Sequence, residues 1–531
     1  MRRWNGWGDD QIDFHVAPSA QAWIAGQIGA ATPPAPVTLA EVIKNVPESR
    51  LPVHTMISAD AEDRVRHALG QSFPDWVAMR SGRIPAFPDG ITYPETEADI
   101  QALYQYAKQH GAKLIPYGGG TSVVGHINPP RSEAPILTVD LSRFNKLHHI
   151  DIKTRLATLG AGLKGPDVER LLKGHGFTLG HFPQSWELST LGGWVVTRSS
   201  GQQSLHYGRI ENLFAGGRMI MPKGTLDLLP LPASAAGSDL RQIVLGSEGR
   251  MGIVTEATVR IAPLPEAEYF HGFFFRTWED GVNAVRSMAQ ARLPLSMLRL
   301  SNAAETEANL NLAGHESAVK MLHDVTAKLG YERGKKCLLL MGCTGKSSTV
   351  ARARKEAGSI VRQHGGQYAS TYFGREWAKR RFTTPYIRNN MWDLGYAIDT
   401  LETSVTWDKI IPAASAIIRG IEEAMQGTGE KVHAFAHLSH VYETGASIYV
   451  TYLFRVLPDP EQMLTHWFKM KDAASRAIIQ HNGTISHQHG VGLDHMPYLE
   501  AEKGAMGMAM LRNILHHADP DGMLNPGKLI E

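Results

Sequence analysis

Three consecutive glycines follow directly after a short predicted strand, in the segment PYGGGTSVVGH at residues 116–126. Because glycine has no Cβ atom, such residues adopt positive φ and let backbone N–H groups approach an anion closely. Thr121 and Ser122 add hydroxyl donors at the same point. The segment is not a Walker loop, since no Gly-Lys-Ser/Thr follows, and it does not open a long helix as GxGxxG does. Taken alone, it is either an anion-binding turn or a plain tight turn.

Two further turns rich in glycine and hydroxyl residues lie in the same part of the chain. The segment HFPQSWELSTLGGWVVTRSSG, residues 181–201, surrounds a glycine pair with small side chains. The segment GSEGRMGIVTEATVRI, residues 246–261, places Glu248 between glycines just before a predicted strand. Three such turns in one domain predict one extended ligand held by backbone groups. A dinucleotide fits this description better than a small metabolite does.

The composition argues against several classes of protein. Lys and Arg number 54 against 52 Asp and Glu, and this net charge of +2 gives no reason to expect nucleic acid as a partner. No stretch approaches the roughly 18 consecutive apolar residues of a membrane span. Cys337 and Cys343 form no CxxC pair, so we expect buried free thiols. Because no apolar export signal follows Arg2 and Arg3, we expect a cytoplasmic protein.

Alternating helix and strand signals indicate an α+β cofactor-binding domain followed by an α/β cap domain. An apolar face and end signals predict a helix between Thr96 and Gly111, and GIVTEATVRI predicts a strand. From Glu266 onward, longer helical patterns alternate with a few strands. The expected parts are a helical lead-in at 1–84, the cofactor domain at 85–265, the cap (substrate) domain at 266–480, and a C-terminal segment at 481–531 that returns to the cofactor domain.

The order of the three turns resembles the FAD-binding fold of the vanillyl-alcohol oxidase and p-cresol methylhydroxylase superfamily. The resemblance implies a p-cresol methylhydroxylase-type FAD-binding domain, with the pyrophosphate at the triple-glycine turn. Covalent attachment in this superfamily often uses a histidine after the glycines, where this chain has Thr121-Ser122-Val123, so we expect non-covalent FAD. The residues that the resemblance assigns to the cofactor are Pro116, Tyr117, Gly118, Gly119, Gly120, Thr121, Ser122, Gln184, Ser185, Ser189, Thr190, Gly193, Thr197, Arg198, Ser199, Ser200, Glu248, Gly249, Gly252, Ile253 and Val254.

Further stretches resemble one family within that superfamily, the alkyldihydroxyacetonephosphate (alkylglycerone-phosphate) synthases. They include WNGWG from Trp4, SMLRLSN around Arg299, PYIRNN around Arg388, ETGASIY ending at Tyr449 and HQHGVG from His487. The resemblance implies a transferase of ether lipid biosynthesis that exchanges the acyl chain of acyl-dihydroxyacetone phosphate for a fatty alcohol. Flavin N5 would serve as a covalent electron sink, without net redox change. A phosphorylated or carboxylated substrate with a long acyl chain, peripheral membrane contact and a homodimer are further expectations.

The same resemblance assigns roles to individual side chains. Tyr449 matches the family's acid/base tyrosine, and with a reference pKa of about 10 it needs nearby positive charge to act as a base. Arg388 matches the substrate-binding arginine, because its planar fork suits a phosphate. Arg299, also assigned to the substrate, matches a family arginine expected to support the flavin side. The histidines assigned to the reacting centre are His181, His487 and His489.

Each assignment has an alternative on the residues alone. A tyrosine in an apolar strand, such as Tyr449, is more often a core residue. The basic run at residues 375–381 before Arg388 is typical of a solvated helix face. His487 and His489, two apart, would share one face of a strand, and without further ligands we predict no metal site.

Two features depart from the synthase pattern and indicate a different function. Gln488 stands where the family has a middle histidine, and a glutamine cannot exchange a proton near pH 7. The ending DPDGMLNPGKL resembles FAD-dependent 2-hydroxyacid dehydrogenases, so an oxidoreductase acting on a 2-hydroxyacid or another alcohol is the alternative. Against it, Tyr449 and Gln488 replace a histidine and a glutamate of the metal site in those dehydrogenases. A non-catalytic flavin-binding protein is the second alternative.

Overall fold

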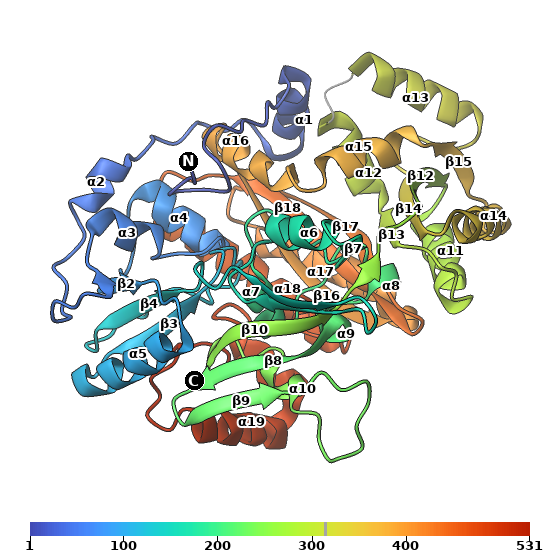
Figure 1. Ribbon diagram of the computed structural model, residues 1–531. Coiled ribbons are helices and arrows are strands. Elements are labelled where there is room, and N and C mark those ends of the chain that lie inside the picture. Colours follow the sequence, from blue (N-terminus) through green and yellow to red (C-terminus); the bar gives the residue numbers. More distant parts are fainter. Residues whose placement is uncertain (313–315) are drawn as a thin grey trace.

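The computed structural model describes the chain except residues 313–315 and consists of two lobes (Figure 1). The first lobe contains the early strands and the C-terminal helix, and the second contains the long sheet of residues 267–455. None of the helices in the described part of the chain is both long and apolar enough to cross a membrane.

A small sheet, mostly parallel, sets the position of the triple-glycine turn. Its strands, in spatial order, are β1 (Ile57–Ser58), β2 (Gly90–Thr92), β4 (Ile136–Asp140) and β3 (Lys113–Tyr117), with β1 antiparallel to β2. The predicted helix is confirmed as α5 (Glu97–His110): Thr96 forms a capping box at its start and Gly111 ends it in the left-handed conformation. Because β3 ends at Tyr117, the glycines begin at the carboxyl edge of the sheet, where α/β proteins commonly bind ligands.

A second, antiparallel sheet supplies the other two turns of this lobe. Its strands, in spatial order, are β5 (Leu147–Asp151), β6 (Leu156–Gly160), β10 (Ile253–Arg260), β8 (Phe214–Met221) and β9 (Gly224–Leu228). Thr190 caps α7 (Leu191–Thr197), and the predicted strand after Gly252 is confirmed as β10. The remaining elements on this side are α6 (Gly165–Lys173), α8 (Ser204–Tyr207), α9 (Ile210–Leu213), α10 (Arg241–Val244), and the strand pair β7 (Phe177–Thr178) with β11 (Ala262–Pro263).

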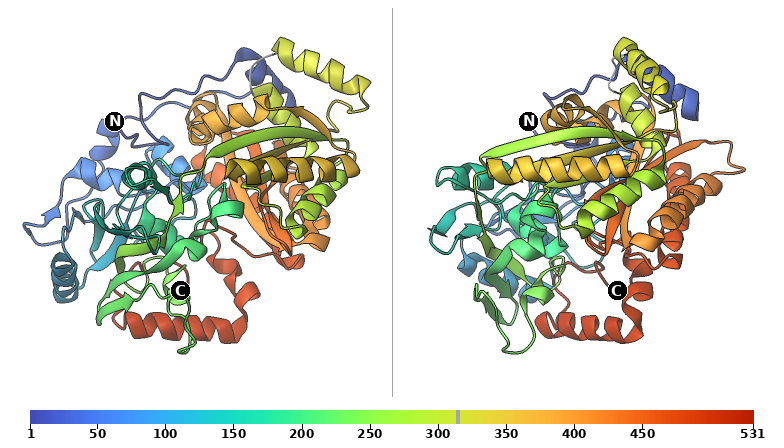
Figure 2. Two further views of the ribbon diagram at one scale, coloured as in Figure 1. Left: turned by 45° about the vertical axis from the view of Figure 1, so that its right-hand side comes forward. Right: turned by 90° about the vertical axis from the view of Figure 1, so that its right-hand side faces the viewer.

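The cap lobe is built on a seven-stranded antiparallel sheet. In spatial order its strands are β15 (Gln367–Ser370), β12 (Ala267–Phe275), β14 (Cys337–Gly345), β13 (Met297–Ser301), β17 (Val432–Val441), β18 (Gly445–Arg455) and β16 (Tyr396–Thr406). Four helices bury one face of it: α11 (Trp278–Gln290), α14 (Ser347–Gln363), α17 (Ile410–Ala424) and α18 (Pro460–Gln480). Figure 2 shows α11 and α14 side by side on the outside of this lobe. Cys337 and Cys343 are buried free thiols in this core, as the sequence indicated.

Alternation along β17 and β18 decides which side chains face away from the helices. Ile448, Val450 and Tyr452 belong to the helix-covered core. Successive side chains of a strand point to opposite faces. Tyr449 and Thr451 therefore face the other lobe. The same rule turns the intervening side chains of β17 toward that lobe: Phe435, His437 and Ser439.

The other helices connect or cover these sheets. The C-terminal helix α19 (Leu499–Ala518) has a kink at Gly504, and its buried face packs into the core of the antiparallel sheet of the first lobe. The others are α1 (Pro18–Ile28), α2 (Leu39–Ile43), α3 (Ala61–Arg66), α4 (Phe73–Ser81), α12 (Ala303–Leu312), α13 (Glu316–Lys328), α15 (Tyr372–Arg380), α16 (Ile387–Asp393), and the 3₁₀ turns η1 (Thr384–Tyr386), η2 (Trp407–Lys409) and η3 (Met496–Tyr498).

Candidate active site

A cavity of about 560 Å³ extends from the triple-glycine turn to the open face of the cap sheet. All three turns that the sequence singled out contribute to its wall, and so do Tyr449, Arg388, Arg299 and His489. The predicted cofactor residues on the wall are Pro116, Tyr117, Gly118, Gly119, Gly120, Thr121, Ser122, Gln184, Ser185, Ser189, Thr190, Gly193, Thr197, Ser199, Ser200, Glu248, Gly249, Gly252, Ile253 and Val254.

Three predicted residues lie outside this wall. The Arg198 guanidinium turns away from the cavity and donates to the carbonyl oxygens of Leu245 and Gln242. His181 is buried behind the wall, where its Nε2 lies 3.2 Å from the Ser199 hydroxyl. His487 is also buried and does not line the cavity.

The glycine turn fits the pyrophosphate of an FAD. A Cβ atom on Gly119 would lie 2.0 Å from the Leu188 carbonyl oxygen, so only glycine lets the turn approach this neighbouring loop. Gly120 has a φ of +65°, which L side chains rarely adopt. Tyr117 Oη, Gln488 Oε1 and Asn525 Oδ1 belong to wall residues and are buried without a hydrogen-bond partner in the described structure. Such orphaned polar atoms fit a polar ligand in this cavity.

Glu248 joins the C-terminal segment to the cofactor lobe. Its carboxylate accepts the backbone N–H groups of Val491, at 2.5 Å, and Gly492, at 2.9 Å. Its own carbonyl accepts the side-chain amide of Asn525 at 2.7 Å. Glu248 adopts a left-handed φ of +50°, an uncommon conformation that these contacts hold in place. The GSEG turn thus contributes to the cavity wall and also fixes the loop that carries His489.

Tyr449 lines the cavity on the side of the cap lobe. Its hydroxyl donates to Thr400 Oγ1 at 3.0 Å, and its ring stacks on His437 with centroids 5.0 Å apart. Burial raises the pKa of Tyr449 to about 12, although Thr400 and Arg388 oppose the rise. The phenol is therefore protonated at neutral pH. Its assignment as the acid/base residue stays a prediction.

Glu305 forms a buried polar group with Arg299 and His437. One carboxylate oxygen lies 2.8 Å from Arg299 Nη2 and 2.8 Å from His437 Nδ1. Burial alone would raise the pKa of this carboxyl, but His437 and Arg299 bring it down to about 2. Because His437 stacks on Tyr449, Glu305 holds in place a ring that touches the candidate acid/base residue.

This low pKa predicts a contribution of Glu305 to stability that depends on pH. A carboxyl whose pKa is lower in the folded than in the unfolded protein stabilises the fold above its unfolded pKa, near 4.5. That stabilisation is on the order of 3 kcal/mol at pH 7 and is lost as the pH falls toward 2. Urea titrations of the wild type and Glu305→Gln should differ in unfolding free energy equally at pH 7 and pH 6, and less at pH 3.5. A constant difference across this range would contradict the prediction.

Glu402 on β16 holds the loop that carries His487, Gln488 and His489. It is 1% exposed, and its Oε1 accepts three consecutive backbone N–H groups, at 3.0, 2.8 and 3.1 Å, from these residues. It lies directly opposite Tyr449 in the β16–β18 ladder. Although burial would raise its pKa, His489 and His487 keep the pKa of Glu402 well below its usual value. His487 and His489 lie in a loop and not on a strand, and the backbone N–H groups of this loop bond to a carboxylate instead of a sheet.

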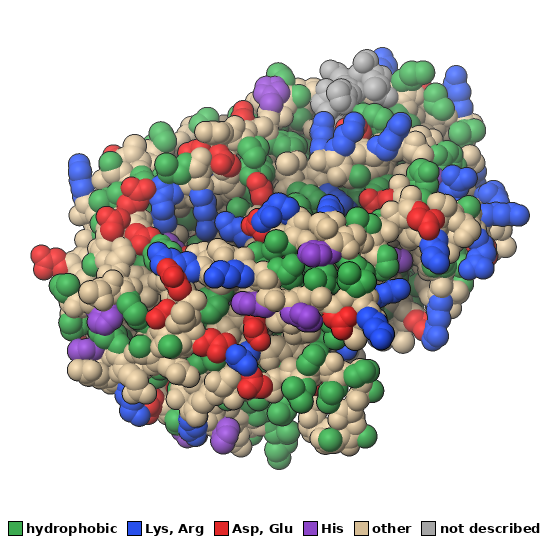
Figure 3. All heavy atoms as spheres, in the orientation of Figure 1, with side chains coloured by type: hydrophobic (Ala, Val, Ile, Leu, Met, Phe, Trp, Pro, Cys, Tyr) green, Lys and Arg blue, Asp and Glu red, His purple; other side chains and the backbone are tan. Residues whose placement is uncertain are grey.

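The basic run before Arg388 divides between surface and cavity. Figure 3 shows Lys and Arg side chains gathered on the side of this face that α14 and α15 occupy, and Lys379 is exposed there. Arg381 turns inward: it stacks on Phe382, 4.8 Å from the ring centroid, and lines the cavity. Arg388 also turns inward and stacks 4.5 Å over Trp76 while its Nη1 donates to the Gln71 carbonyl. The solvated helix face therefore describes only part of the run.

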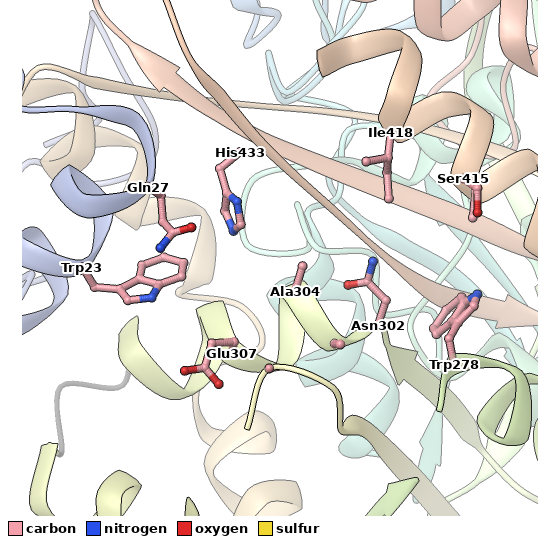
Figure 4. A pocket seen from close by; sticks show the side chains of 12 residues that line it. Trp23, Gln27, Trp278, Asn302, Ala304, Glu307, Ser415, Ile418 and His433 are labelled. Carbon is pink, nitrogen blue, oxygen red and sulfur yellow. The ribbon is translucent and has the colours of Figure 1, made fainter. Parts of the chain in front are cut away.

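A second hollow, of about 500 Å³, lies among α1, α12, α17 and β17 (Figure 4). Trp23 from α1, Glu307 from α12 and His433 from β17 contribute to its wall, and Trp278 lies at its other end. None of the residues that the sequence analysis assigned to cofactor, substrate or catalysis lines it. The predicted groups thus gather in the larger cavity.

Comparison with known proteins points to the same site. A family model described as an FAD binding domain matches residues 88–228, and one described as the C-terminal domain of FAD linked oxidases matches residues 264–529. A protein of Dictyostelium discoideum named alkyldihydroxyacetonephosphate synthase is 30% identical over 473 residues, which cover 88% of this chain and 77% of that protein. The chain belongs to the alkyldihydroxyacetonephosphate synthase family.

Two further members of this family extend the match over the whole chain. A Caenorhabditis elegans protein with the same name is 29% identical over 577 residues and covers 100% of this chain and 95% of its own length. A solved structure of an alkyldihydroxyacetonephosphate synthase has a TM-score of 0.84 at 26% identity and covers 99% of both chains. The expected FAD cofactor and the α+β fold are confirmed, and the protein is an FAD-dependent enzyme.

Proposed function

We propose that this family member replaces the acyl chain of an acyl-dihydroxyacetone phosphate with a fatty alcohol. The observation that carries the proposal is a single cavity in which the flavin-binding turns, Tyr449 and Arg388 meet an apolar wall. An apolar wall suits a long hydrocarbon chain, because burying such a chain removes it from water. The apolar residues on this part of the wall are Phe14, Leu312, Ile387, Ile398, Phe435 and Leu453.

The proposed exchange is balanced without an external oxidant. The bond between carbon 1 of dihydroxyacetone phosphate and the acyl carboxylate oxygen breaks, and the alcohol oxygen bonds to that carbon. The alcohol gives up one proton, and the fatty acid leaves. Bound flavin supplies a temporary acceptor for an electron pair. The chain's own residues must hold the phosphate, exclude water and move a proton at carbon 1.

Tyr449 and His489 are proposed to move that proton. The protonated phenol of Tyr449 is a donor in the resting enzyme, so it can accept a proton only after passing its own to another group. Burial lowers the pKa of His489, which leaves its imidazole neutral and able to accept. The two rings lie edge to face with centroids 5.8 Å apart. Gln488, on the same loop, cannot perform this transfer.

Arg388 is proposed to bind the substrate phosphate. Arg388→Lys is expected to raise the KM for palmitoyl-dihydroxyacetone phosphate about tenfold and to change kcat less than about threefold. Lysine keeps the charge but loses the planar fork and the stacking on Trp76. Arg375→Lys, at an exposed position of the same basic run, is the control and should leave both constants unchanged. An unchanged KM in Arg388→Lys would remove Arg388 from phosphate binding.

The proposed function can be tested on the flavin spectrum. Adding palmitoyl-dihydroxyacetone phosphate anaerobically to the holoenzyme should bleach the flavin, and adding hexadecanol should restore its colour and yield the ether product. A panel of D-2-hydroxyacids should leave the spectrum unchanged. Reduction by one of these acids, with reoxidation by a dye or oxygen, would support the oxidoreductase instead. Peripheral membrane contact and a homodimer stay predictions.

A further inference from the structure

The first residues of the chain contact the triple-glycine turn. Arg2 Nη2 donates to the carbonyl oxygen of Gly119 at 2.9 Å. Arg2 itself does not belong to the cavity wall, whereas Gly119 and Gly120 do. The guanidinium therefore contacts the turn without itself lining the cavity.

This contact acts on a peptide unit between two residues that line the cavity. The carbonyl of Gly119 and the N–H of Gly120 belong to one peptide group, so a cation on the oxygen draws electron density from the N–H. Hydrogen bonds in such a chain strengthen one another. The same contact fixes the orientation of a glycine peptide that would otherwise have unusual conformational freedom.

Tyr117 packs beside Arg2 at the same point. A Cβ atom on Gly120 would lie 2.2 Å from Tyr117 Oη and 2.3 Å from Arg2 Nη2, so both groups pack directly against the turn. The Tyr117 ring lies 5.9 Å from the Arg2 guanidinium. The residue is 1% exposed and lines the cavity, and its hydroxyl has no hydrogen-bond partner in the described structure.

The rest of the segment is fixed to the helix that carries Arg388. Trp7 and Phe14 line the cavity. The backbone of Trp7 exchanges two hydrogen bonds with the Asn389 side chain, both 3.0 Å long. The N–H of Phe14 donates to Asn390 Oδ1 at 3.1 Å. Residues 2–14, the N-terminal strap, therefore connect the glycine turn to α16.

We propose that the N-terminal strap is part of the cofactor site and that Arg2 is a positioning residue for the FAD pyrophosphate. Arg2 orients the Gly119–Gly120 peptide and strengthens its N–H as a donor to the anion. The attachment to α16 keeps Arg2 in this place. The ligand class is a dinucleotide pyrophosphate, and the effect does not depend on which reaction follows.

The test measures cofactor binding to the apoprotein by fluorescence quenching. Arg2→Gln should raise the Kd for FAD about tenfold, the loss expected for one charge-assisted hydrogen bond. Arg2→Lys, which keeps the charge, should recover part of this loss. Riboflavin contains the flavin ring but no phosphate, so its Kd should be the same for wild type and Arg2→Gln. The Kd for ADP, which carries the pyrophosphate, should rise in Arg2→Gln as the Kd for FAD does.

Arg3→Gln is the matched control on the same segment. The Arg3 guanidinium donates to carbonyl oxygens of the strap itself, those of Asp10 and Ile12, and not to the turn. Its Kd for FAD should stay within twofold of the wild type. An unchanged Kd for FAD in Arg2→Gln would overturn the proposal, and so would an equal loss for riboflavin or an equal loss in Arg3→Gln.

Discussion

Tyr449→Phe is expected to lower turnover by at least about 1,000-fold while the purified protein stays yellow. The substitution removes the hydroxyl proposed to move the proton at carbon 1 and changes little else. The ring stack on His437 is kept, and Thr400 loses one hydrogen bond. The glycine turn lies on the other lobe, so FAD binding should not change. The measurement is kcat with palmitoyl-dihydroxyacetone phosphate and hexadecanol, together with flavin absorbance per protein.

Tyr396→Phe is the control for this substitution. Tyr396 is a buried tyrosine on β16 of the same sheet, and its hydroxyl donates to the Gly29 carbonyl away from the cavity. Its loss should change kcat less than about threefold, because it touches no reacting group. If Tyr449→Phe retained near-normal turnover, Tyr449 would have no part in the mechanism. If it lost its flavin, Tyr449 would have a structural role in the cofactor site instead.

The three turns that line the cavity could be predicted from sequence because each of them is one short continuous segment. In the triple-glycine turn, Gly120 has a positive φ, and a Cβ atom on Gly118 or Gly119 would lie 2.4 or 2.0 Å from a neighbouring atom. The second and third turns carry the same local signal of glycine next to hydroxyl residues. Helix α5 could likewise be predicted from its own cap, stripe and terminal glycine. Local chemistry was sufficient in these segments.

The cap side could not be predicted in full, because its contacts join distant segments. Glu402 lies in an ordinary strand pattern, and only the strand pairing places it opposite Tyr449. Glu305 is significant only because β13 and β17 bring Arg299 and His437 to it. No spacing pattern in the sequence predicts the pairing of Glu402 with Tyr449 or the contacts of Glu305. Their signal, a carboxylate among apolar neighbours, becomes informative only when burial is known.

The N-terminal lead-in makes a further contact, with the glycine turn, that the composition does not indicate. The sequence predicts residues 1–84 as a helical lead-in packed on the body of the protein. The contact between Arg2 and the glycine turn spans 117 positions in the chain. The family resemblance includes the segment WNGWG from Trp4, but this pattern does not predict that the segment contacts α16. A motif without periodicity can indicate which family a chain resembles, but it does not indicate which residues the motif contacts.

Glu402→Gln is expected to lower kcat about 100-fold and the unfolding free energy by about 2 to 3 kcal/mol at pH 7. An amide carries no charge to hold three backbone N–H groups and the two histidine rings beside them. The loop should then shift relative to Tyr449, and a displacement of about 1 Å at a reacting group costs roughly that factor in rate. Because the Glu402 carboxyl has a lowered pKa, its contribution to stability is present above pH 4.5 and is lost below it.

Glu169→Gln separates a general loss of stability from a loss of positioning. Glu169 is also a buried carboxylate, 3% exposed, and it accepts the N–H groups of Leu179 and Gly180 at 3.1 and 3.2 Å outside the cavity wall. Its substitution should leave kcat within about threefold, because Glu169 touches no reacting group. If both variants lost turnover in proportion to stability, Glu402 would only support the fold. A kcat that falls in Glu402→Gln alone, with KM and FAD content unchanged, assigns Glu402 to holding the histidine loop against Tyr449.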